Sequence, residues 1–221
     1  MMGKMLTITA HDGAQISAYE ARPDGVIKGG VIILQEIFGV NVHIREVCDD
    51  YANAGWVAIA PALFDRAEAN IELAYDQDGV AAGRAYKDKC DAFAEGDIKA
   101  WVGQLADDGI KAVIGYCWGG SLAWRMACRH DGIDAAIAYY GGELPELKDE
   151  QPRCPVQAHF GATDPTIPMA GVEDFMAAQA NVASYVYDAG HGFNCDHRPQ
   201  FNANASQQAR ARVDAFLATL R

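Results

Sequence analysis

One stretch, residues 112–123, constrains the fold of this chain more than any other. It reads AVIGYCWGGSLA, in which an apolar run ends in a Gly-x-Cys-x-Gly motif and a run compatible with a helix follows. A buried strand that passes through a sharp turn directly into a helix has this pattern, and glycines at 115 and 119 allow strand and helix to pack closely. The stretch therefore predicts a strand–turn–helix unit with Cys117 at its tip, in a strained backbone conformation.

The tip of such a turn suits a nucleophile. The sulfur of Cys117 would face the positive end of the helix that starts near Trp118, which favours a thiolate. The backbone N–H of Trp118 would point to where an oxyanion develops. With 22 glycines and 6 cysteines in 221 residues, about 0.06 matches to the motif are expected by chance. The motif is therefore moderate evidence, and a buried, inert cysteine in a strand-to-helix turn is the alternative.

Size and charge limit the classes of protein to consider. The chain has 221 residues, half of them hydrophobic, which is enough for one sizeable core and short for two domains. The net charge of −12 argues against nucleic acid and anionic membrane surfaces as partners. A small anionic substrate stays possible, because one or two nearby arginines can outweigh a distant field. We therefore expect a single domain that binds a small molecule.

Targeting signals and cysteine usage predict the compartment. The apolar run near the N-terminus is interrupted by threonines and is too short for a signal peptide, and no stretch approaches 18 apolar residues. The six cysteines are scattered without a C-x-x-C pair, so thiols rather than disulfides are expected. These features predict a cytoplasmic protein with no membrane contact, a monomer, or alternatively a homodimer.

Hydrophobic patterning predicts the order of the secondary-structure elements. Alternating runs at 4–10 and 15–21 flank an Asp-Gly turn, which indicates a hairpin. Short apolar runs predict strands at 29–35, 56–60, 112–116, 134–140, 155–161 and 183–188. Helices are expected at 42–54, at 91–107, after Cys117, at 169–180 and at 203–220, with a surface segment at 62–90 and a loop at 143–154. This order predicts an α/β fold in which helices flank a mostly parallel central sheet, with an N-terminal hairpin, in one domain spanning 1–221.

Side chains that could take part in catalysis follow four of the predicted strands. Ligands bind beyond the carboxyl ends of strands in open parallel sheets, where Glu36, Cys117, Asp164 and His191 are expected. A cysteine nucleophile needs a base, for which His191 is the best candidate, and an imidazole needs an acid such as Asp164 to orient it. Asp188 is an alternative acid close to the histidine. The order nucleophile, acid, histidine is that of the α/β-hydrolase fold.

Each of these side chains also has an ordinary interpretation. A histidine in a Gly-His-Gly loop is often a surface residue, and an aspartate before proline is often a turn residue. A zinc site formed by His191, Cys195 and His197 is a further alternative. A fourth protein ligand is not evident, and the glycines suit a mobile catalytic loop better. We therefore expect no metal and no cofactor.

Glu36 follows the first central strand and has two interpretations. It is either a solvated loop carboxylate or a neighbour of Cys117. In the second case its charge would hold the proton on sulfur, because two adjacent anions repel each other. The N–H of Ile37 would then be the second donor to the oxyanion.

Four segments together resemble the dienelactone hydrolase family. They are QEIFG at 35–39, GYCWGG at 115–120, GATD at 161–164 and GHGF at 190–193, and the similarity covers nearly the whole chain. The resemblance implies an α/β-hydrolase with a triad of Cys117, Asp164 and His191. It also implies that Glu36 keeps the resting thiol neutral until substrate binds. Members of the family open the enol-lactone ring of dienelactone (carboxymethylenebutenolide) to maleylacetate during the catabolism of chloroaromatics.

The chain departs from the best-known members where they bind the substrate carboxylate. Those members carry an arginine shortly after the phenylalanine that follows the catalytic histidine, whereas this chain has NCD at 194–196 and Arg198 later. A second family arginine precedes an Ala-Tyr-Lys stretch, and here Arg84 is near that stretch but shifted in spacing. The candidates for substrate contact are Arg84, Tyr86, Phe38 and Arg198.

Three functions are consistent with the sequence. The first is a hydrolase that cleaves an ester or lactone bond of a small anionic substrate through an acyl-enzyme on Cys117. The second is a broader carboxylesterase or thioesterase. The third is a non-catalytic ligand-binding or thiol-redox protein on the same fold. An intact set of Cys117, Asp164 and His191 disfavours the third, which does not need all of them.

Overall fold

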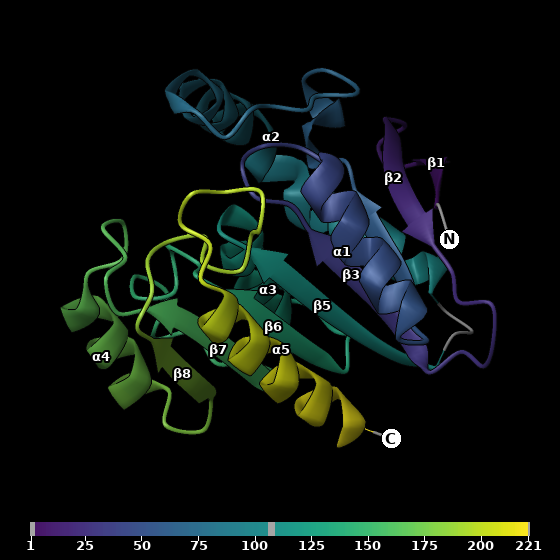
Figure 1. Cartoon of the computed structure of the whole chain (residues 1–221). Coiled ribbons are helices and arrows are strands. Elements are labelled where there is room, and N and C mark those ends of the chain that lie inside the picture. The colour runs from purple at the N-terminus through teal and green to yellow at the C-terminus, as the bar shows by residue number, and fades with distance from the viewer. Residues whose placement is uncertain (1–2, 106–108, 221) are drawn as a thin grey trace. The chain divides into compact units, whose positions relative to one another are not determined.

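A computed structural model describes residues 3–105 and 109–220 of the chain (Figure 1). The strands are β1 (Lys4–Thr9), β2 (Gln15–Ala21), β3 (Gly29–Leu34), β4 (Val57–Pro61), β5 (Ile110–Tyr116), β6 (Ala135–Tyr139), β7 (Val156–Gly161) and β8 (Ala183–Tyr187). The helices are α1 (Val42–Asn53), the 3₁₀ helix η1 (Leu63–Arg66), α2 (Gln77–Gln104), α3 (Trp118–Arg129), α4 (Met169–Ala178) and α5 (Ala203–Ala218). The chain divides into two compact units, residues 1–113 and 114–221, so that β5 belongs in part to each.

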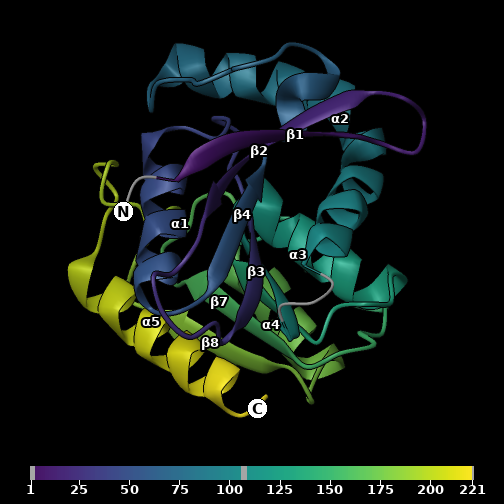
Figure 2. The same cartoon turned by 90° about the vertical axis from the view of Figure 1, so that its right-hand side faces the viewer.

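The first unit contains the predicted hairpin and the first parallel strands. Its strand order is β1-β2-β4-β3-β5, with β1 and β4 antiparallel to β2, and β3 parallel to β4 (Figure 2). Every residue of β3 and β4 is buried, as expected for strands covered on both faces. Helix α1 packs on β3 and β4 and begins at an N-cap, Asn41, whose side chain accepts a hydrogen bond from the N–H of Ile44.

The surface segment expected at 62–90 is largely helical, and the predicted helix start at 91 is wrong. Residues 63–66 form η1, and α2 begins at Gln77, fourteen residues earlier than the predicted start at 91. Asp76 caps this helix by accepting a hydrogen bond from the N–H of Gly79 at 2.7 Å. Val80 is the one large apolar side chain in residues 77–84, and Gly79 and Gly83 lower the helix propensity there, so hydrophobic periodicity did not indicate a helix. The predicted end of this helix, at 106–107, lies outside the described residues.

The second unit completes the α/β pattern. Its strand order is β5-β6-β7-β8, and β7 is parallel to both β6 and β8. Helix α5, yellow in Figure 1, contacts this sheet through Arg212, whose guanidinium carbon lies 4.3 Å from the ring centroid of Tyr185 and whose backbone oxygen accepts from Gln157. Loops that leave the carboxyl ends of β5, β7 and β8 carry Cys117, Asp164 and His191 respectively.

A buried aromatic layer lies within the strands of this unit. The ring of His159 stacks on Tyr139, with centroids 4.6 Å apart, and Nδ1 lies 2.8 Å from the hydroxyl of Tyr187. Burial, together with the charge of Arg212, lowers the pKa of His159 to about 3. His159 is therefore a neutral core residue. In residues 3–105 and 109–220, no helix combines the length and apolar character that crossing a bilayer requires.

Candidate active site

The predicted sharp turn is present between β5 and α3. Cys117 has φ 56° and ψ −115°, a conformation that side-chain-bearing residues rarely adopt. Its N–H donates to the carbonyl oxygen of Tyr139 at 3.0 Å, and its own carbonyl accepts from the N–H of Ser121 at 3.1 Å. A Cβ on Gly115 would lie 1.8 Å from the carbonyl oxygen of Gly119. Close packing of strand and helix therefore requires glycine at 115.

The half-buried side chain of Cys117 stands at the N-terminus of a twelve-residue helix. Helix α3 begins at Trp118, so the first N–H groups of that helix have no partner within its own hydrogen-bond ladder. Such groups, together with the helix dipole, stabilise negative charge. The turn therefore offers an electropositive position beside the sulfur.

Two adjacent loops carry the other candidate residues. The N–H of Ala162 donates to the carbonyl oxygen of Tyr187 at 2.7 Å, and the N–H of Thr163 donates to that of Ala189 at 3.0 Å. A Cβ on Gly161 would lie only 2.4 Å from the oxygen of Ala189. The loop after β7 is thus joined by its backbone to the loop after β8.

Asp164 and His191 form a hydrogen-bonded pair across these loops. Oδ2 of Asp164 lies 2.6 Å from Nδ1 of His191, and the carboxylate is fully buried. Burial alone would raise the pKa of Asp164, but hydrogen bonds from His191 and Thr166 hold it below its usual value. Asp188, the alternative acid, is not the residue paired with this nitrogen. The carboxylate therefore stays ionised and faces Nδ1 of the imidazole.

His191 also interacts with Cys117. Burial tends to lower the pKa of His191, but hydrogen bonds with Asp164 and with Cys117 raise it to about 10. Because Nδ1 faces Asp164, Nε2 is the ring nitrogen available to the sulfur. The three side chains thus form a connected series, sulfur to imidazole to carboxylate.

Two neighbours of His191 were not foreseen from the sequence. Thr166 lies two residues after Asp164, with Oγ1 3.0 Å from Nδ1 of His191. Tyr140 follows β6 with φ 38°, and its ring centroid lies 5.0 Å from that of His191 and 5.4 Å from that of Phe193. An Asp-x-Thr spacing could have indicated Thr166, because such a hydroxyl often bonds a nearby carboxylate. No sequence signal marks Tyr140, whose unusual conformation depends on tertiary packing.

Arg198, a predicted substrate-contact residue, lies beside the histidine loop. A Cβ on Gly192 would lie 2.6 Å from Nη1 and 2.8 Å from Cζ of Arg198, so the guanidinium covers the backbone next to His191. Gly192 has φ 76°, which glycine adopts without strain. The cationic side chain of Arg198 therefore lies against the residue that follows His191.

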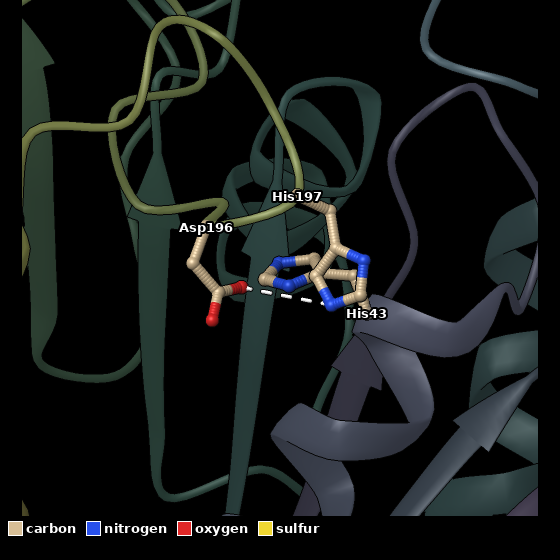
Figure 3. Close-up of side chains that lie close together, drawn as sticks. All are labelled: His43, Asp196 and His197. Carbon is tan, nitrogen blue, oxygen red and sulfur yellow. Dashed lines mark ion pairs between the residues drawn. The ribbon is translucent and has the colours of Figure 1, made fainter.

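The three residues of the alternative zinc site each have a different environment. Nδ1 of His191 faces Asp164, Cys195 is fully buried, and Nε2 of His197 lies 3.9 Å from a carboxylate oxygen of Asp196 (Figure 3). The ligand atoms of His191, Cys195 and His197 do not all come within 4.8 Å of one another in the described structure. The geometry therefore gives this trio no common position for an ion.

The remaining candidates belong to the first unit. Glu36, the second residue after β3, is fully buried, and its carbonyl oxygen accepts from Nε2 of Gln35 at 3.3 Å. Ile37 is half-buried in the following turn, and the buried ring of Phe38 packs against Tyr75 with centroids 4.6 Å apart. Burial argues against the solvated-carboxylate interpretation of Glu36. Its predicted role toward Cys117, and that of the Ile37 N–H, stay predictions.

Tyr86 and Arg84 lie on α2. The hydroxyl of Tyr86 donates to Glu68 at 2.6 Å, and its ring packs 5.3 Å from that of Phe64. Arg84 is exposed. Tyr86 thus has a structural role within its own unit, and substrate contact by either residue stays a prediction.

A mostly parallel sheet flanked by helices, with a strained cysteine turn between a strand and a helix, defines an α/β-hydrolase. The family model described as "Dienelactone hydrolase family" matches residues 16–220. The chain belongs to the dienelactone hydrolase family and is a hydrolase.

Individual relatives agree with this assignment. The chain is 33% identical over 236 residues to a Synechocystis sp. protein provisionally named as a carboxymethylenebutenolidase, covering 97% of this chain and 96% of that protein. It is 30% identical over 237 residues to "Carboxymethylenebutenolidase 1" of Cupriavidus pinatubonensis, covering 100% and 99%. A crystal structure from Klebsiella pneumoniae, provisionally named as a dienelactone hydrolase, superposes with a TM-score of 0.83 at 28% identity, covering 98% of both chains.

Proposed function

We propose that this hydrolase cleaves an ester or lactone bond of a small anionic molecule, with Cys117 as its nucleophile. The observation that carries the proposal is the connected series of Cys117, His191 and Asp164. Asp164 orients His191 through a 2.6 Å contact, and His191 in turn interacts with the sulfur. A thiol, a base and an acid that orients the base are a set suited to nucleophilic acyl transfer.

The proposed reaction proceeds in two stages. Nε2 of His191, whose pKa is raised to about 10, holds the proton of the thiol, and the sulfur attacks the carbonyl carbon as a thiolate. The carbon–oxygen bond then breaks, and His191 returns its proton to the leaving oxygen. This gives a thioester on Cys117 and a free hydroxyl group, which stays on the same molecule when the substrate is a lactone. In the second stage His191 takes a proton from water, the hydroxide attacks the thioester, and the acid and the thiol are released.

Negative charge on the carbonyl oxygen needs donors at both stages. The N–H of Trp118, at the start of α3, is the proposed donor on the nucleophile side. The resemblance to the family implies the N–H of Ile37 as the second. Removing one such donor commonly slows a hydrolase by about 10²–10³-fold.

A small anionic ester or lactone is the proposed substrate. The Cupriavidus relative is named for carboxymethylenebutenolide, a lactone that carries a carboxylate. The guanidinium of Arg198, which covers Gly192 beside His191, is a suitable partner for such a group. All six cysteines carry thiols rather than disulfides, which supports the proposal that the enzyme acts in the reducing cytoplasm.

Steady-state hydrolysis of dienelactone, p-nitrophenyl esters and acyl thioesters tests this proposal. Cys117→Ala should abolish turnover of every substrate that the wild type hydrolyses, because loss of a triad member commonly costs more than about 10³-fold. Cys154→Ala is the matched control, since burial raises the pKa of that thiol to about 11. Turnover by Cys117→Ala above about a tenth of the wild-type rate would reject Cys117 as nucleophile. Faster hydrolysis of neutral esters than of dienelactone would favour a broader esterase.

A further inference from the structure

The carboxylate of Asp164 is held by more than His191. Among the described residues, Oδ1 accepts hydrogen bonds from the N–H and the hydroxyl of Thr166, both at 2.7 Å, and from the N–H of Ile167 at 3.2 Å. Oδ2 lies 2.6 Å from Nδ1 of His191. One oxygen is thus saturated by its own loop, and the other is directed at the imidazole.

The hydroxyl of Thr166 also reaches the histidine. Its single hydrogen is donated to Oδ1 of Asp164, so its oxygen can act only as an acceptor toward Nδ1 of His191, 3.0 Å away. The contact is therefore favourable only when Nδ1 carries a hydrogen. The Nδ1–H of His191 is then shared between Oδ2 of Asp164 and Oγ1 of Thr166.

We propose that Thr166 is a positioning residue that fixes the reactive tautomer of His191 by accepting from Nδ1 while it donates to Asp164. The inference rests on the proposed function, because this tautomer leaves Nε2 to exchange a proton with Cys117. In the other tautomer, Nδ1 would present a lone pair to two oxygen acceptors. Thr166 therefore raises the cost of the unproductive state and stabilises the imidazolium, which is a stronger donor than neutral imidazole.

The substitution Thr166→Val isolates the hydroxyl. Valine has nearly the same shape, and the N–H groups of residues 166 and 167 can still bond Asp164, so the loop keeps its turn. The titratable groups facing the ring are Asp164 and Cys117, with the guanidinium of Arg198 over the neighbouring Gly192, and the substitution changes none of them. Thr163→Val is the matched control, because the described structure contains no hydrogen bond from the Thr163 side chain.

Two measurements test the proposal. The first is kcat/KM for a p-nitrophenyl ester. The second needs no substrate: it is the pH midpoint of iodoacetamide alkylation of Cys117, followed by peptide mass spectrometry. Thr166→Val should lower kcat/KM about five- to tenfold. It should also move the alkylation midpoint to higher pH, because a less stable imidazolium delays formation of the thiolate. Thr166→Ser should restore both values, and Thr163→Val should match the wild type.

The proposal is overturned if Thr166→Val has the turnover and the alkylation midpoint of the wild type. It is also overturned if Thr166→Ser, folded by circular dichroism, is as impaired as Thr166→Val, because shape rather than the hydroxyl would then matter. Failure of the proposed function is a separate result. It would show as turnover by Cys117→Ala, whereas the alkylation midpoint still reports on Thr166.

Discussion

Oδ2 of Asp164 and Nδ1 of His191 lie 2.6 Å apart although 27 residues separate them in the chain. Helix α4 and strand β8 occupy the interval, and backbone hydrogen bonds join the two loops at Ala162 and Thr163. The pairing therefore depends on the sheet and not on local sequence. It gives the fold a charge interaction whose strength depends on pH.

Stability should fall as pH rises, because of His191. The pKa of this residue is raised to about 10 in the folded chain, against 6.5 as the ordinary value. A group whose folded pKa is raised stabilises the fold fully below the unfolded pKa, and that contribution is lost as pH rises to the folded pKa. In urea denaturation, the advantage of the wild type over His191→Gln should shrink from about pH 6.5 to about pH 10.

His11, which is exposed in the turn of the N-terminal hairpin, supplies the control for this experiment. His11→Gln should follow the wild-type curve across the same pH range. If the difference between wild type and His191→Gln were constant with pH, the pairing with Asp164 would not raise the pKa of His191.

Glycine at 115 should be essential for stability. Gly115→Ala would bring a Cβ to within 1.8 Å of the oxygen of Gly119, so strand and helix would have to separate. We expect a loss of at least about 2 kcal/mol in the free energy of unfolding. Gly103→Ala, in α2 with open space around the new Cβ, should be neutral or stabilising by up to about 1 kcal/mol. Equal effects of the two substitutions would contradict the close packing at the elbow.

The two candidate arginines predict different kinetics. Arg198→Ala should raise KM for anionic esters and leave neutral esters nearly unchanged, because only the former lose a charged partner. Arg84→Ala, on the exposed face of α2, is made in parallel. Equal loss on both substrate types by Arg198→Ala would show a structural role, and selective loss by Arg84→Ala alone would transfer the role to that residue.

Glu36→Gln tests the family prediction that this carboxylate restrains the thiol. A negative charge that acts on Cys117 disfavours the thiolate, so removing it should move iodoacetamide alkylation of Cys117 to lower pH. Turnover should fall as well if the carboxylate takes part in the reaction cycle. Glu46→Gln on α1 provides a control substitution of the same type. Unchanged alkylation together with unchanged turnover would limit Glu36 to a structural role.

The class of fold was predictable because strands buried on both faces are continuous apolar runs, and Asp-Gly marks the hairpin. The family was predictable because four short motifs occur in order. The start of α2 was missed because its first turns carry few large apolar residues and two glycines, and a capping aspartate determines where they begin. Thr166 and Tyr140 were missed for another reason. The Asp-x-Thr spacing indicates at most that Thr166 bonds Asp164. The proximity of Thr166 and Tyr140 to His191 arises from loops that follow different strands, and sequence spacing does not encode that geometry.

Trapping the acyl-enzyme identifies the residue that acts as nucleophile. The enzyme is mixed with a p-nitrophenyl ester, quenched in acid during turnover and digested, and the peptides are analysed by mass spectrometry. With Cys117 as nucleophile, we expect one added acyl group on the peptide that contains Cys117, absent from Cys117→Ala and present in Cys154→Ala. An acyl group on a different residue, or continued turnover by Cys117→Ala, would rule out Cys117 as the nucleophile.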